Sequence, residues 1–272
     1  MTQPLEIEVE GLVQHYGLRP VLQEVSFVIP QGSCVAVLGP NASGKTTLLE
    51  TIGGMLHPWR GSVRIGGLVR RGSVEGERAI RERCVYLPVD AWMPPTLTVR
   101  EFLVGVGQLY GLPLDTADPA SGRPLYERVE AVADLFDLTS VLDAGGSSLS
   151  SGQSRKVQLA AASLPETKTL VLDEPFSGGL DPAGIVALKK VLRHLTRTEG
   201  RTVLFSIPVP QLLDGLVDRV IVLGDGRVTL DATPAVIIAG SESGTLADAL
   251  TTLAFADAAT AADRFLMKGE DA

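Results

Sequence analysis

The segment GPNASGKT at residues 39–46 constrains this chain more than any other feature of its sequence. It fits the pattern G-x-x-x-x-G-K-[ST], it follows a short apolar run at residues 33–38, and apolar residues at helical spacing follow it over residues 45–55. Glycine lets such a loop wrap closely around phosphate groups, while successive backbone N–H groups and the positive end of the next helix attract the anion. The order strand, glycine loop, helix therefore predicts a phosphate-binding loop in an α/β fold.

The sequence of this loop also predicts which ligands it binds. Lysine at this position reaches the β- and γ-phosphates of a nucleoside triphosphate, and the following threonine hydroxyl is suited to ligate Mg²⁺. We therefore expect Lys45 to bind phosphate and Thr46 to bind the metal. The residues expected to contact the nucleotide in this segment are Gly39, Pro40, Asn41, Ala42, Ser43, Gly44, Lys45, Thr46 and Thr47.

An acidic strand end lies far along the chain. The apolar run at residues 169–172 is followed by Asp173 and Glu174. Acids after a strand are by themselves more often the start of a solvated loop, but the upstream glycine loop favours a functional interpretation. We expect Asp173 to hold Mg²⁺ and Glu174 to polarise an attacking water, which makes Glu174 the candidate catalytic residue.

Composition excludes several other classes of protein. Of 272 residues, 24 are Lys or Arg and 32 are Asp or Glu, so the net charge is −8, opposite to that of a typical nucleic-acid binder. The two cysteines, Cys34 and Cys84, lie in apolar segments without metal-ligand spacing and are expected to be core thiols. Apolar runs end before the roughly 20 residues that a membrane span needs, and no signal peptide is expected.

The remaining pattern alternates strands and helices, which predicts an α/β core with a helical insert. A charged, polar connector is expected at residues 70–83. Strands are expected at residues 5–9, 25–29, 33–38, 62–65, 169–172, 203–205 and 217–223, and helices at residues 45–55, 98–110, 125–136, 152–164, 183–195 and 245–266.

A third motif, LSSGQ at residues 149–153, lies between the first two. With it the chain resembles the ATP-binding cassette (ABC) ATPases over about residues 5–235, because the three segments match that family's Walker A, signature and Walker B motifs in order. The resemblance implies ATP and Mg²⁺ as ligands. It also implies a P-loop NTPase core with an N-terminal antiparallel β subdomain and an inserted α-helical signature subdomain at about 90–165. The cassette would span residues 1–240, followed by a C-terminal helical tail at 241–272.

The resemblance also assigns roles around a dimer of cassettes. Tyr16 matches the residue that stacks on adenine, and Asp181 matches the D-loop aspartate that crosses the dimer interface. This D-loop has one residue more than the family's usual spacing, and Gly179 looks like the insertion. The residues that would contact ATP held by the other subunit are Ser150, Ser151, Gly152 and Gln153.

Two positions depart from the family pattern. Val89 stands where the family has the Q-loop glutamine, beside Asp90, which could partly substitute, and Pro208 stands where it has the switch histidine.

The resemblance, closest to bacterial export-type cassettes, implies the ATP-binding subunit of a transporter at the cytoplasmic face of the cell membrane. Its partners would be a separate membrane permease and a second cassette, the same or different. The alternative is a regulatory cassette that binds ATP but hydrolyses it poorly; a soluble ABC ATPase of translation or repair is disfavoured because no tandem cassette is present.

Overall fold

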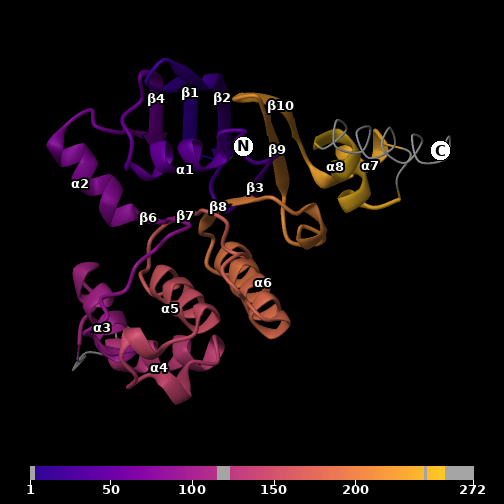
Figure 1. Ribbon diagram of the computed structural model, residues 1–272. Helices are drawn as coiled ribbons and strands as arrows, with labels where there is room; N and C mark the ends of the chain where they lie inside the picture. The colour runs from indigo at the N-terminus through magenta and orange to yellow at the C-terminus, as the bar shows by residue number, and fades with distance from the viewer. Residues whose placement is uncertain (1–3, 115–122, 242–243, 255–272) are drawn as a thin grey trace.

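The computed structural model describes residues 4–114, 123–241 and 244–254, and its strands form two sheets (Figure 1). One sheet is antiparallel with the order β2-β1-β4-β5, and the other has the order β10-β9-β3-β8-β7-β6. The strands are β1 Leu5–Tyr16, β2 Arg19–Pro30, β3 Cys34–Leu38, β4 Arg60–Ile65, β5 Leu68–Val69, β6 Cys84–Leu87, β7 Thr169–Leu172, β8 Thr202–Ile207, β9 Arg219–Gly224 and β10 Arg227–Ala232.

Helices cover both faces of the second sheet and fill the connection between β6 and β7 (Figure 1). This is the predicted fold class, an α/β core with an antiparallel subdomain and a helical insert, and it is confirmed. No helix in the described ranges is both long and apolar enough to cross a membrane. The helices are α1 Lys45–Gly53, α2 Val74–Arg83, α3 Val99–Leu109, α4 Leu125–Leu135, α5 Ser151–Ser163, α6 Pro182–Arg197, α7 Pro234–Ala239 and α8 Leu246–Ala254, with 3-10 turns η2 Thr139–Val141, η3 Gly146–Ser148 and η4 Pro210–Leu212.

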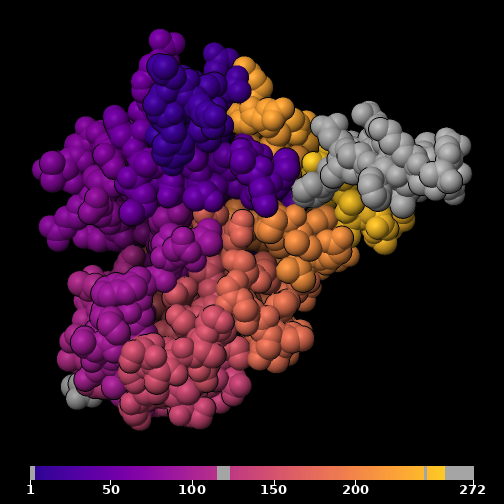
Figure 2. All heavy atoms as spheres, in the orientation of Figure 1, coloured from indigo at the N-terminus to yellow at the C-terminus, as the bar shows by residue number. Residues whose placement is uncertain are grey.

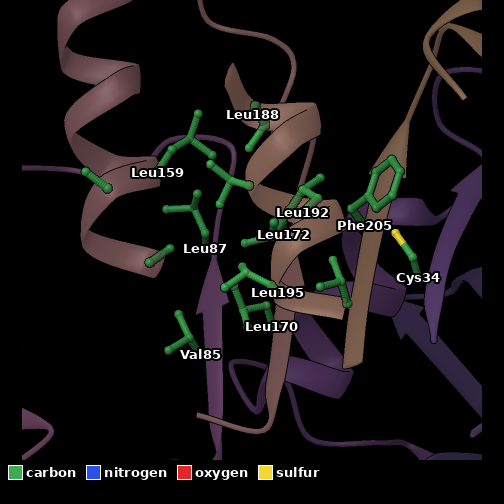
Figure 3. Close-up of a cluster of buried hydrophobic side chains, with 14 of the residues drawn as sticks. Cys34, Val85, Leu87, Leu159, Leu170, Leu172, Leu188, Leu192, Leu195 and Phe205 are labelled. Carbon is green, nitrogen blue, oxygen red and sulfur yellow. The ribbon is translucent and has the colours of Figure 1, made fainter. Parts of the chain in front are cut away.

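The parallel strands are buried on both faces, which explains their unbroken apolar sequences. In β3, Val35 and Val37 join a core with α1 and the antiparallel sheet. Cys34, Ala36 and Leu38 point to the opposite core. Figure 3 shows part of this second core, where side chains of the sheet meet leucines of α5 and α6. Both cysteines are buried and free, as predicted.

In the helical insert, α3, α4 and α5 pack on one another, and α5 also contacts β6. Figure 2 shows the insert as a lobe below the sheets. Two capping boxes define where its helices begin. The Thr98 hydroxyl accepts from the N–H of Glu101, whose carboxylate accepts from the N–H of Thr98. Ser150 and Gln153 exchange the equivalent pair of bonds at the start of α5. Each box satisfies two backbone donors that the first turn of a helix leaves free.

The prediction of a polar connector at residues 70–83 is wrong, because residues 74–83 form α2. Only Ile80 is fully buried on this helix, so it lacks the apolar repeat that identifies helices in sequence. Its start is set instead by the Ser73 hydroxyl, which accepts from the N–H of Gly76 at 3.0 Å. Acids lie in its first turn and arginines in its last, in favourable positions for the helix dipole.

Three further elements, β5, β10 and α7, were not expected from the sequence. The β9–β10 hairpin turns at Asp225-Gly226, where both residues have positive φ (47° and 73°). An Asp-Gly pair between strands is a strong hairpin signal and could have identified β10. The tail helix predicted at 245–266 is present as α8, Leu246–Ala254, and the rest of that prediction lies outside the described residues.

Candidate nucleotide site

The candidate residues gather at the carboxyl edge of the parallel sheet. Strands β3, β8, β7 and β6 are adjacent and parallel, so the loops that follow them leave the sheet on the same side. Ligands of open α/β sheets bind at this edge because loops and helix N-termini converge there. The glycine loop follows β3, Pro208 follows β8, Asp173 follows β7, and Val89 lies two residues after the end of β6.

The glycine loop has the backbone shape that its sequence predicts. Ala42 and Gly44 both have positive φ (65° and 102°), and Gly44 is the N-cap of α1. A Cβ atom at Gly44 would lie 2.8 Å from a methyl carbon of Leu22, so glycine fits where the loop packs on β2. The loop therefore ends at the N-terminus of α1, and a helix N-terminus after a glycine loop attracts phosphate.

Lys45 lies across this loop. Its Nζ donates hydrogen bonds to the carbonyl oxygens of Gly39 (2.9 Å) and Pro40 (3.0 Å). Burial lowers the pKa of Lys45, and the negative charges of Glu174 and Asp173 oppose this shift. The ammonium group therefore lies in the field of both acids, as the sequence predicted for one site. A phosphate could replace either carbonyl as an acceptor of Nζ.

Asp173 offers an unused ligand atom. Its side chain is fully buried, Oδ1 accepts a hydrogen bond from the hydroxyl of Ser206, and Oδ2 has no partner in the part of the chain that the structure describes. A buried carboxylate oxygen without a partner is costly, and Mg²⁺ prefers such oxygen ligands. Together with the exposed Thr46 hydroxyl at the start of α1, it fits a magnesium ion.

Glu174 has an unusual backbone conformation. Its φ is 43°, an unusual value for a residue with a side chain. Its N–H donates to the Ser206 hydroxyl at 2.8 Å, so this one hydroxyl connects both acids. The sequence-based prediction did not include Ser206; its place at the end of β8, beside the acidic strand end, was the available signal.

Arg155 of α5 contacts the two loops that follow β6 and β7. From the second turn of α5, its buried guanidinium donates to the carbonyl oxygens of Asp173 (3.0 Å) and Glu174 (2.8 Å). It also donates to the carbonyls of Pro88 (3.3 Å) and Val89 (3.2 Å). The acidic strand end, the loop after β6 and the signature helix thus share one side chain.

Gln158 extends this network one turn further along α5. Its Oε1 accepts from Arg155 at 3.1 Å, and its Nε2 donates to the carbonyl of Ala91 at 2.6 Å. Neither residue was predicted as part of the site. The sequence shows no signal for either role, because the burial of both side chains within residues 155–162 comes only from the fold.

The signature segment lies beside the D-loop of the same chain. A Cβ atom at Gly152 would lie 2.6 Å from the carbonyl oxygen of Gly179, so the inserted D-loop glycine packs directly on the signature. Lys156 donates to the carboxylate of Asp181 at 3.3 Å, and Asp181 caps α6 through the N–H of Gly184. A cavity of about 410 Å³ is lined by both segments, including Ser150, Ser151, Gly152, Gln153 and Asp181.

The remaining candidates are Tyr16, Val89 and Pro208. Tyr16 ends β1 with 53% of its surface exposed, and its hydroxyl donates to Glu50 of α1 at 3.3 Å. Its ring is thus open beside the helix that follows the glycine loop. Val89 and Pro208 lie at the same sheet edge, but neither side chain has a polar atom to offer there.

Comparison with known proteins decides the family. The model of the ABC transporter family matches residues 22–177, more than half of the chain. The chain belongs to the ABC transporter family. The family expected from the sequence is confirmed, and this ABC protein is of the ATP-binding subunit type.

Individual relatives agree with this assignment. The uncharacterized ABC transporter ATP-binding protein YdbJ of Bacillus subtilis (strain 168) is 31% identical over 233 residues, covering 86% of this chain and 70% of that protein. The Nod factor export ATP-binding protein I of Paraburkholderia xenovorans (strain LB400) is 32% identical over 235 residues, covering 86% and 72%. A solved structure of the ATP-binding subunit of an ABC transporter superposes with a TM-score of 0.79 at 28% identity, covering 91% and 99%.

Proposed function

We propose that this ABC protein binds MgATP and couples its hydrolysis to the movement of a substrate through a separate membrane permease. The observation that carries the proposal is the set of charges at one sheet edge. Lys45 lies in the field of Asp173 and Glu174, and Asp173 keeps a buried oxygen without a partner among the described residues. An ammonium group for phosphate and a spare carboxylate oxygen for Mg²⁺ are what a nucleotide site requires.

Each residue has a distinct task in this proposal. The backbone N–H groups of the glycine loop and Lys45 hold the phosphates, and Tyr16 stacks on the adenine. Thr46 and Asp173 hold Mg²⁺, which supplies positive charge against the phosphates when bound. Glu174 orients the attacking water and accepts its proton.

We further propose that two cassettes close over two nucleotides. The signature residues Ser150, Ser151, Gly152 and Gln153 then contact the ATP of the opposite cassette, and Asp181 lies at the interface. The cavity lined by these residues supports this arrangement, since it is open on the surface of the single chain. The protein would work at the cytoplasmic face of the membrane, docked on its permease, with residues 1–240 as the cassette, a helical subdomain at about 90–165 and residues 241–272 as a tail.

A second candidate function is a regulatory cassette that binds ATP but hydrolyses it slowly. It is favoured by Val89 and Pro208, which bring no polar side-chain atom to the site. Both candidate functions require ATP binding, and they differ in the rate at which ATP is hydrolysed.

Binding is tested by thermal unfolding with and without MgATP. A ligand that binds the native state alone at about 100 times its Kd stabilises by about 2.7 kcal/mol, which is roughly 5–10 °C for a chain of this size. We expect that shift in the wild type and its loss in Lys45→Ala. Lys189→Ala, on α6 away from the loop, is the matched control and should keep the shift. An undiminished shift in Lys45→Ala would contradict the site.

A further inference from the structure

A second cavity, of about 790 Å³, lies at the opposite edge of the parallel sheet from the nucleotide site. It is lined by α4, by the connection from α5 to β7, and by α6, which are the lower elements in Figure 1. Lys168 and Arg201 immediately precede β7 and β8, whereas Asp173 and Pro208 follow these strands. The cavity is therefore separated from the proposed ATP site by the length of the sheet.

The wall of this cavity is cationic although the protein is acidic. Five lysines and arginines line it against two glutamates, in a chain whose net charge is −8. Each glutamate pairs with one arginine of the wall: Glu166 pairs with Arg128, and Glu199 pairs with Arg201 at 3.6 Å and also lies 3.3 Å from His194. The excess charge at this wall is therefore positive and is not neutralised by the acids that line it.

Two of these cations are free, and a third is buried. Lys168 and Lys190 are exposed at the cavity, and their ammonium groups have no hydrogen bond or ion pair with any residue in the described ranges. Arg201 is only 4% exposed; it donates to Ser163 and Thr167 and pairs with Glu199 at 3.6 Å, while its Nε has no partner within the same ranges. The charge of Arg201 is therefore paired, whereas the two exposed lysines carry positive charge that no acid of the wall neutralises.

The rest of the wall is apolar. Leu135 of α4 is 46% exposed, and Val132, Leu164, Val191 and Leu195 form a buried floor beneath it. The volume is in the range of small-molecule sites, which combine an apolar lining with a few polar groups. Inorganic phosphate would leave this apolar surface uncovered, and a neutral apolar ligand would leave both lysines unused.

We propose that this cavity binds a soluble amphipathic anion, a carboxylate or phosphate attached to an apolar chain or ring. The anionic group lies between Lys168 and Lys190, and the apolar part covers Leu135 and Val191. Such a ligand contacts α4 of the helical insert and α6 of the core at once. The site is independent of the glycine loop and of the proposed ATPase activity.

Decyl phosphate below its micelle concentration is a suitable probe, followed by isothermal titration calorimetry. We expect one molecule to bind per chain, and both decanol and inorganic phosphate to bind at least 10-fold more weakly. Vesicles of anionic phosphatidylglycerol distinguish the source of the ligand. Binding to such vesicles without binding of monomeric decyl phosphate would overturn the proposal in favour of a membrane surface.

Variants locate the probe. Lys168→Gln with Lys190→Gln should weaken binding by about 10-fold or more, while Lys189→Gln, the neighbouring lysine that does not line the cavity, should not. Ala131→Trp, at an exposed cavity position of α4, should block the space without changing charge. Equal affinity in all these folded variants would overturn the proposal. Loss of binding in Lys45→Ala would also overturn it, because the probe would then occupy the glycine loop.

Discussion

Asp173 and Glu174 are neighbours in sequence, yet the fold gives their carboxylates different surroundings. Asp173 is fully buried and shares a hydrogen bond with Ser206, whereas Glu174 is partly exposed and its backbone has a positive φ of 43°. Such a conformation costs on the order of 1 kcal/mol or more and persists only where neighbours hold it. Ser206 and Arg155 hold it here, through the N–H and the carbonyl of Glu174.

Glu174→Gln keeps the shape of the side chain and removes its basicity. We expect turnover to fall by roughly 100-fold or more, which is the usual loss when a general base is removed. ATP binding should persist, because the ground-state contacts come from the glycine loop, and ATP-dependent dimers should accumulate. Phosphate release and size-exclusion chromatography with MgATP measure the two effects. Glu82→Gln, on the exposed face of α2, is the control, and unchanged turnover in Glu174→Gln would exclude Glu174 as the base.

Among the elements, α5 connects most of the site. It begins at the signature segment, and its second turn holds the loops after β6 and β7 through Arg155. Arg155→Met leaves several buried carbonyl groups without this donor, so we expect the free energy of unfolding to fall by about 2–4 kcal/mol.

Arg155→Lys separates positioning from simple stability. A single ammonium cannot span the carbonyls that the guanidinium contacts, so stability should recover in part while turnover stays low. Urea unfolding and ATPase assays give the two readouts. Arg78→Met, which removes a largely exposed ion pair, should change stability by no more than about 0.5 kcal/mol. Turnover that recovers fully in Arg155→Lys would show that charge alone matters at this position.

Glu6 connects the two sheets. From β1 its buried carboxylate accepts from Arg83 at the end of α2 (2.7 Å) and from the hydroxyl of Thr169 in β7 (2.6 Å). Glu6→Gln leaves Arg83 without its charged partner, so we expect a loss of about 3 kcal/mol in unfolding free energy. Glu10→Gln, at an exposed position in the middle of the same strand, is the matched control. Equal denaturation midpoints for the two variants would show that this contact does not stabilise the fold.

At the scale of the whole molecule, the proposed dimer would make each cassette depend on residues of the other. In that proposal this chain offers its signature to the opposite pocket, while its own pocket has Val89 and Pro208 where the resemblance leads us to expect polar side chains. Preorganised hydrogen bonds of this kind are commonly worth about 3–4 kcal/mol each in a transition state. We therefore expect the purified chain to bind ATP and turn it over slowly.

Val89→Gln with Pro208→His should raise turnover if the missing groups limit it. Adding Lys45→Ala to this double variant should abolish the gain, which controls for contaminating ATPase. Brisk hydrolysis by the wild-type chain alone would contradict the regulatory candidate. It would show that another group, such as Asp90, performs these tasks.

Local patterns in the sequence predicted much of the fold and most of the candidate site. The apolar runs of β3 and β7 are buried strands because both of their faces are covered. In the glycine loop, Gly44 has the positive φ that favours glycine, whereas the positive φ of Ala42 has no such signal in the sequence. Elements with little buried apolar surface were missed. α2 buries one residue fully, so it lacks the apolar repeat on which such predictions depend. β10 buries no residue fully, but Val228, Leu230 and Ala232 alternate with polar residues, a signal that was available and was not used.

The sequence by itself determined the order of the elements, the glycine loop and the acidic strand end, because each depends on neighbours a few residues apart. Tertiary structure alone decided how these parts are held together. Arg155 meets Val89 across 66 positions, and Ser206 meets Asp173 across 33. The cavity beside Lys168 and Lys190 likewise unites segments that are distant in the chain. Such contacts form only when packing closes long loops, so no local pattern records them.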